Sequence, residues 1–130
     1  MELIDLRTRV LESDADLDGP LTESDDIAVG QGALAVRYAH MLPDPAGPGR
    51  DIDRSALGEL PDGHDHLFVV LSGRGRVSGG GIIRTPIKAG QAAYFPKEEG
   101  YLIFADKPLT GILLKGSDLA LSLRALQAAA

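Results

Sequence analysis

The stretch Gly63-His64-Asp65-His66-Leu67-Phe68-Val69-Val70-Leu71-Ser72-Gly73 begins with two histidines two residues apart and continues as an apolar run that is typical of a β-strand. Alternate side chains of a strand share a face, so His64 and His66 are predicted to point the same way as Phe68 and Val70. The glycine that ends the run predicts a tight turn into a further strand. This region therefore predicts a strand that carries ionisable groups beside a hydrophobic core.

A second stretch, Gly90-Gln91-Ala92-Ala93-Tyr94-Phe95-Pro96, predicts the start of a matching strand. Together the two stretches resemble the two sequence motifs of the cupin superfamily. Gly73 takes the place of the glycine that closes the first motif, and Gly90 and Pro96 match the glycine and the proline of the second. The resemblance covers roughly residues 30 to 116 and implies a jelly-roll fold.

The metal-binding positions of the cupin motifs carry other residues in this chain. Counting back seven residues from Gly73 places His66 where the family has its metal-binding glutamate or glutamine. The H-x-H pair of the family then falls on Leu60 and Asp62, or one residue earlier for each in the longer spacing. Tyr101 takes the place of the family's last histidine.

In a second register, His64 and His66 are themselves the H-x-H pair, and Val70 or Leu71 replaces the glutamate. Neither of these two side chains binds a metal. We favour the register counted from Gly73, because a glycine turn constrains backbone geometry more tightly than a two-residue motif does.

Composition limits the classes of function. At 130 residues the chain is long enough to form one domain, 1–130, with its own hydrophobic core. It contains no cysteine, which excludes thiol catalysis, disulfides and cysteine-ligated zinc. A net charge of −6, with acidic stretches at 12–16 and 23–26, opposes binding to nucleic acid. We find no membrane span or signal peptide and expect a cytoplasmic protein that binds no membrane.

The run 34–42 alternates so that Tyr38 and His40 share a face, which we expect to be the inner one, and Arg37 points the other way. Residues 43–63 hold four of the eight prolines and predict a long surface loop. The other strand-like runs, separated by glycine or proline turns, are 65–72, 74–77, 82–84, 91–95, 101–105 and 109–115.

These runs predict an all-β, single-domain, cupin-like jelly-roll β-barrel over residues 30–116. An N-terminal arm with one strand is expected over residues 1–29, and a short C-terminal helix over 117–130, where Ser117 is a suitable N-cap. The leucine-rich tail and the apolar patches of the arm also predict a homodimer.

The candidate site residues are those expected on the inner face of the barrel. His66 and Tyr101 are the predicted catalytic pair: His66 moves a proton, and Tyr101 donates to an oxygen that gains charge. His64 is a further catalytic candidate, and Glu98 or Glu99 is an alternative rim residue in the turn that follows Pro96. The predicted substrate-binding residues are Tyr38, His40, Asp62, Phe68, Val70 and Ile103.

Three functions remain open from the sequence. The first is a cupin-type isomerase, cyclase or dehydratase that acts on a small, largely apolar metabolite by non-redox acid–base chemistry without a cofactor. The second is a non-catalytic small-molecule-binding or regulatory module. The third is an enzyme that binds a divalent transition metal (Fe, Mn, Ni or Zn) through the unusual ligand set His40, His64 and His66.

Overall fold

The computed structural model of the chain describes residues 21–24, 26–29, 34–43 and 57–116, and all of the regular structure in these ranges is β-strand. The strands are β1 (Leu21–Glu23), β2 (Ile27–Val29), β3 (Leu34–Met41), β4 (Leu57–Glu59), β5 (Asp65–Ser72), β6 (Arg74–Gly79), β7 (Ile82–Lys88), β8 (Ala92–Phe95), β9 (Tyr101–Ala105) and β10 (Leu109–Gly116). The expected C-terminal helix over 117–130 and residues 1–20 of the expected arm lie outside the described residues.

Within those ranges, no helix is long and apolar enough to cross a membrane.

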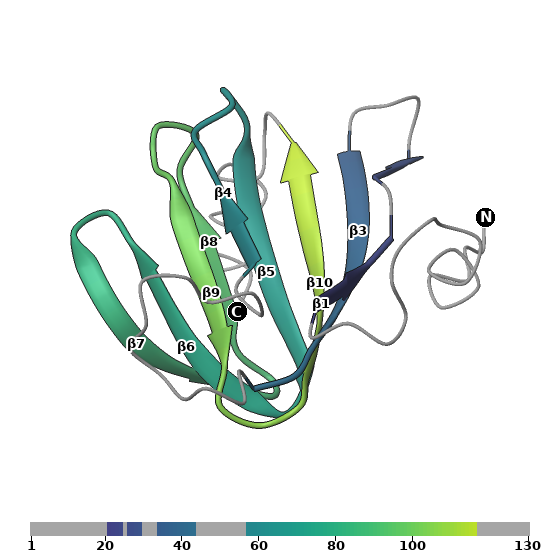
Figure 1. Cartoon of the computed structure of the whole chain (residues 1–130). Coiled ribbons are helices and arrows are strands. Elements are labelled where there is room, and N and C mark those ends of the chain that lie inside the picture. The colour runs from purple at the N-terminus through teal and green to yellow at the C-terminus, as the bar shows by residue number, and fades with distance from the viewer. Residues whose placement is uncertain (1–20, 25, 30–33, 44–56, 117–130) are drawn as a thin grey trace, which may run out of the picture.

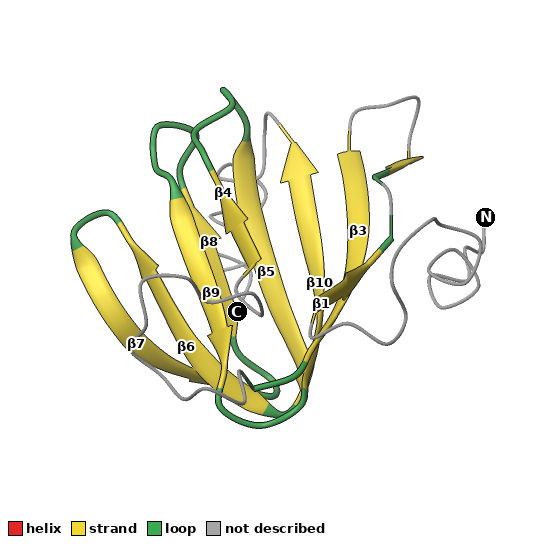
Figure 2. Ribbon diagram, viewed as in Figure 1, coloured by secondary structure: helices red, strands yellow, loops and turns green. Residues whose placement is uncertain are grey.

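The strands form two antiparallel sheets that face each other (Figures 1 and 2). The first sheet has the order β1-β3-β10-β5-β8, with β2 also paired to β3, and the second has the order β4-β9-β6-β7. Between described strands, no hydrogen-bonded ladder joins the two sheets, so the expected closed barrel is instead a pair of facing sheets.

The open seam lies between β7 and β8, which are edge strands of different sheets. Strand β7 is poorly suited to a second partner strand, because Pro86 has no N–H to donate. Its register against β6 also shifts at a bulge, where Arg84 has a φ of 51° and its N–H donates to Ser78 Oγ at 2.8 Å. These features leave the seam open on the β7 side.

The hydrophobic core lies between the sheets, where alternate residues of each strand point inward. Its largest fully buried side chains are Phe68, Met41, Leu57, Ile103, Leu109, Leu113 and Val70. Strands β5 and β10 approach so closely that a Cβ on Gly111 would lie 2.4 Å from Cζ of Phe68. Glycine at this position makes room for the Phe68 ring.

Strand β3 presents the opposite face to the one expected. Its register pairs Ala39 with Gly111 and Met41 with Leu109, and all four of these residues are buried. The inner face of β3 is therefore the one that carries Ala39 and Met41, and the expectation that Tyr38 and His40 face the interior is wrong. Alternation shows which residues share a face, but the partner strands decide which face is covered.

Two further strand expectations need correction. The long loop expected over 43–63 contains β4 (Leu57–Glu59), which pairs with β9 and brings fully buried Leu57 opposite Ile103. The short strand expected over 82–84 continues to Lys88 as β7. Strand β4 was missed because three residues are too few to show a periodicity. Strand β7 was expected to be too short because the proline within it predicts the end of a strand.

Candidate functional site

His66 connects the two sheets at the start of β5. Its Nδ1 lies 2.7 Å from the hydroxyl of Tyr101 on β9, and its Nε2 lies 3.0 Å from Oδ1 of Asp62. A carboxylate only accepts hydrogen bonds, so Nε2 carries a proton; in the neutral tautomer that this defines, Nδ1 accepts from the Tyr101 hydroxyl. The His66 side chain is 4% exposed, and both ring nitrogens are engaged within the protein.

Asp62 receives three hydrogen bonds. Besides His66, the ammonium group of Lys115 lies 2.8 Å from Oδ2, and the backbone N–H of His64 donates to Oδ1 at 3.0 Å. Burial acts to raise the pKa of Asp62, but the bonds from Lys115, His66 and the His64 N–H outweigh it and hold this pKa well below its usual range. The bond to Asp62 also raises the pKa of Lys115. Asp62 is therefore a carboxylate and Lys115 an ammonium ion at neutral pH.

Tyr101 is a buried proton donor. It is 5% exposed, and its ring stacks on Phe95 with centroids 4.1 Å apart and an angle of 10° between the planes. Burial raises the pKa of the Tyr101 hydroxyl well above its usual range, and the nearby Glu59 carboxylate raises it further. The phenol keeps its proton at neutral pH and donates it in the bond to His66.

Arg37 provides a second polar link between the sheets. From the inner face of β3, its guanidinium group contacts Glu59 on β4 at 2.9 Å, Glu23 at 3.1 Å and Asp26 at 3.0 Å. Burial acts to lower the pKa of Arg37, but the hydrogen bond to Asp26 and the charges of the three carboxylates raise it above its usual range. The sequence-based expectation left this arginine outside the site, and the structure places it, with its side chain 19% exposed, on the inner face of β3.

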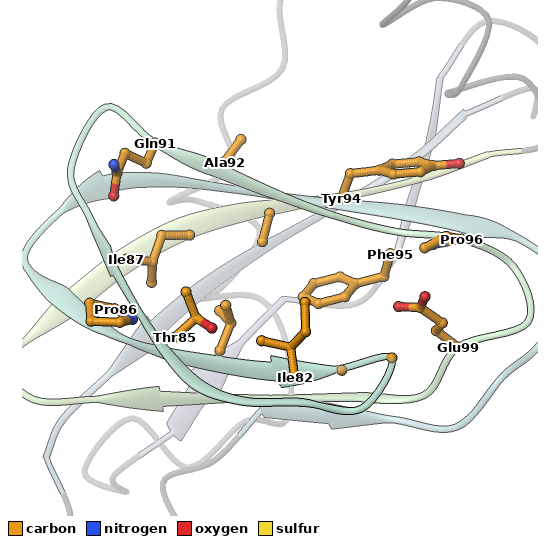
Figure 3. Close-up of a pocket in the computed structure, with 14 residues that line it drawn as sticks. Ile82, Thr85, Pro86, Ile87, Gln91, Ala92, Tyr94, Phe95, Pro96 and Glu99 are labelled. Atoms are coloured by element: carbon orange, nitrogen blue, oxygen red, sulfur yellow. The ribbon is translucent and has the colours of Figure 1, made fainter.

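A cavity of about 680 Å³ lies between β6 and β7 on one side and β8 on the other (Figure 3). It is next to Tyr101, because Phe95 lines the cavity and stacks on the Tyr101 ring. Of the residues that the structure describes, Glu99 is the only charged one that lines it, and Phe95 stands between the cavity and Tyr101. The lining residues are Val77, Gly79, Gly80, Ile82, Thr85, Pro86, Ile87, Gln91, Ala92, Ala93, Tyr94, Phe95, Pro96 and Glu99.

The structure brings together three of the predicted site residues, His66, Tyr101 and Asp62. His64 lies at the exposed start of β5 with Nδ1 3.7 Å from Asp62, and its side chain is 49% exposed. His40 lies on the outer face of the first sheet, where its Nδ1 is 3.0 Å from Thr110 Oγ1.

The other predicted binding residues do not line the cavity. Tyr38 lies on the outer face with His40, and Phe68, Val70 and Ile103 are fully buried in the core.

Sequence reasoning missed the interior roles of Arg37, Lys115, Glu59 and Phe95. The position of Lys115 could have been predicted. It lies two residues after Leu113 in the mostly apolar strand β10, so the two side chains share the inner face of the sheet. Glu99, one of the two rim candidates in the turn after Pro96, does line the cavity.

No family model matches the sequence, and no curated protein matches it. Solved structures do match. A conserved protein with a double-stranded β-helix domain from Klebsiella pneumoniae aligns with a TM-score of 0.65 at 14% identity, over 89% of this chain and 90% of that chain. A cupin domain of an XRE family transcriptional regulator from Enterobacter cloacae aligns with a TM-score of 0.58 at 12% identity, over 75% of this chain and 96% of that chain. This chain has the cupin fold. Another cupin neighbour, ectoine synthase from P. lautus, has a TM-score of 0.64 at 11% identity, over 89% of this chain and 78% of that chain. Cupin neighbours thus include an enzyme and a regulatory module, and the fold alone does not choose between them.

The polar residues of this chain do not fit the metal that the cupin motifs imply. Among the described residues, no group of three or more histidine, aspartate or glutamate side chains is placed to hold a metal ion. His66 is bonded at both nitrogens, Tyr101 retains its proton, and His40 faces the opposite side of the sheet. The set His40, His64 and His66 therefore does not converge, because β3 presents its other face to the interior.

Proposed function

We propose that this cupin binds a small, largely apolar molecule in the cavity between β6, β7 and β8. The cavity itself carries the proposal: about 680 Å³ falls within the usual range of ligand sites, roughly 300–1,000 Å³. Its lining is mainly apolar with a few polar groups, as in most small-molecule sites. It lies where β7 and β8 leave a seam between the sheets, which gives a ligand a route of entry.

The test uses 1-octanol as a neutral probe and follows its binding by the backbone amide signals of the isotope-labelled protein. We expect saturable shifts at Gln91, Ala92 and Ala93, which line the cavity. Thr85→Phe places a ring in the cavity and is expected to abolish these shifts. Ser72→Phe adds the same ring at an exposed position outside the cavity and serves as the matched control. Equal affinity in the two variants, or shifts confined to other parts of the protein, would contradict the proposal.

Acid–base catalysis is the second candidate function, and the hydrogen-bonded chain Asp62–His66–Tyr101 favours it. In this chain the carboxylate holds the imidazole in one tautomer, and the imidazole accepts from the phenol. A substrate oxygen that gained charge could draw on the Tyr101 proton only if the Phe95 ring moved aside, because that ring covers Tyr101 on the cavity side.

A structure with bound ligand separates the two candidates. Catalysis requires a polar ligand atom within hydrogen-bond distance of the Tyr101 hydroxyl or of His66, directly or through one water. A ligand held entirely on the cavity side of Phe95 would support binding without this chemistry.

A further inference from the structure

We infer that the ligand of this cavity is an amphipathic cation, that is, an organic ammonium ion attached to an apolar chain. The inference rests on the proposed binding function and specifies the ligand class of the same site. It follows from the charge of the lining, from the aromatic ring beside that charge, and from the charges behind the ring.

Within the described ranges, the only charged group that lines the cavity is the carboxylate of Glu99. Glu99 forms no ion pair with any of the described residues, and it is partly buried at the end of the cavity next to Phe95 (Figure 3). A Cβ on Gly80 would lie 2.6 Å from Oε1 of Glu99, so the carboxylate lies directly against the turn between β6 and β7. Gln91 is a neutral amide whose side-chain oxygen accepts from the backbone N–H of Lys88 at 3.0 Å. The polar anchor of the cavity is therefore negative.

The aromatic ring next to this carboxylate also favours a cation. Phe95 lines the cavity (Figure 3), and stacking on Tyr101 holds its ring in place. An ammonium group within about 6 Å of an aromatic ring is attracted by the negative face of that ring. A carboxylate beside a fixed ring is a combination that suits an ammonium group and repels an anion.

The ion pairs behind Phe95 carry an excess of negative charge. Four carboxylates face two cations there, so these six groups together carry a net charge of −2; they are Glu23, Asp26, Glu59, Asp62, Arg37 and Lys115. The whole chain carries −6. No cationic side chain from the described part of the chain lines the cavity, so a bound anion would lose its hydration without gaining a partner there.

Three probes of matched chain length test the inference: n-octylammonium, 1-octanol and octanoate, each titrated into the wild-type protein at neutral pH. We expect n-octylammonium to bind about tenfold more tightly than 1-octanol, because it adds one charged contact at a partly exposed site, and octanoate to bind most weakly. Glu99→Gln should weaken n-octylammonium binding about tenfold and leave 1-octanol binding unchanged. Glu98→Gln is the matched control: it makes the same change of net charge at the preceding, exposed residue outside the cavity, and both affinities should stay as in the wild type.

The outcomes separate this inference from the proposed function. If none of the three probes binds in the cavity, the proposed function itself fails. If 1-octanol or octanoate binds at least as tightly as n-octylammonium, the cavity is a ligand site but the inference is wrong. If Glu98→Gln weakens n-octylammonium as much as Glu99→Gln does, the attraction comes from the net charge, and the inference is again wrong. If Glu99→Gln does not fold, the order of the three probe affinities for the wild-type protein tests the inference.

Discussion

Replacement of Asp62 by asparagine tests whether the polar group around His66 stabilises the fold. The carboxylate accepts from His66 Nε2 at 3.0 Å, from Lys115 Nζ at 2.8 Å and from the His64 N–H at 3.0 Å. Asp62→Asn keeps nearly the same shape and one side-chain oxygen. It removes the charge and one acceptor.

The size of the effect follows from these bonds. A hydrogen bond to a charged group contributes about 1.5–3 kcal/mol, and one between neutral groups about 0.5–1.5 kcal/mol. Three donors converge on the carboxylate, but the Asp62 side chain is 29% exposed, so solvent screens part of its charge. We therefore expect Asp62→Asn to lower the free energy of unfolding by about 2–3 kcal/mol at pH 7, by loss of charge and of one acceptor.

The pH dependence has a definite sign. The pKa of Asp62 in the folded protein lies well below the unfolded value of about 3.9. Above about pH 5 both states are ionised, and the stabilisation is fully present. As the pH falls below about 4, the unfolded state takes up a proton that the folded state does not, so stability is lost toward the folded pKa. The difference between wild type and Asp62→Asn should therefore shrink below pH 4 relative to its value at pH 5.

Urea unfolding, followed by circular dichroism at pH 7, 5 and 3.5, measures these free energies. Asp106→Asn is the matched control, because Asp106 is 37% exposed and pairs with Arg76 at 2.8 Å on the protein surface. Such a pair contributes about 0–1 kcal/mol. A loss for Asp62→Asn no greater than for Asp106→Asn, or a difference that does not change between pH 5 and 3.5, would refute the reasoning.

Two further predictions concern the interior. Tyr101→Phe should lower the free energy of unfolding by about 1–3 kcal/mol, because buried His66 loses the partner of its Nδ1 while the aromatic stacking is kept; an unchanged urea midpoint would contradict the bond. Gly111→Ala should cost about 1–3 kcal/mol, because the new Cβ would lie 2.4 Å from Cζ of Phe68 in a packed core. Gly58→Ala, whose Cβ meets mainly the tip of a half-exposed leucine side chain, should cost less in the same denaturation series.

The interior of the site could be anticipated only in part. The resemblance to the cupin motifs, counted from Gly73 for His66 and from Pro96 for Tyr101, put the two residues at positions whose counterparts meet in the cupin fold. In the structure Nδ1 of His66 and the Tyr101 hydroxyl are 2.7 Å apart. The expectation that they meet came from the resemblance, and a turn glycine kept the motif spacing in register with the strand. Their catalytic roles stay a prediction, as do the single domain, the homodimer and the cytoplasmic location.

The amino-acid sequence by itself determined the all-β class and the main strands. The expected runs 65–72 and 101–105 coincide with β5 and β9, because alternating apolar residues and glycine or proline turns are local signals. These signals act within a few residues of the chain. They need no knowledge of the partner strands.

Only the tertiary structure decided which faces meet. The alternation of β3 is equally compatible with either face inward, and pairing with β10 turned Arg37 inward and His40 outward. The cavity likewise joins residues of β6, β7 and β8 with Glu99 from a turn. Such contacts depend on the packing of segments that are distant in the chain, because a side chain is covered only when another strand is placed over it.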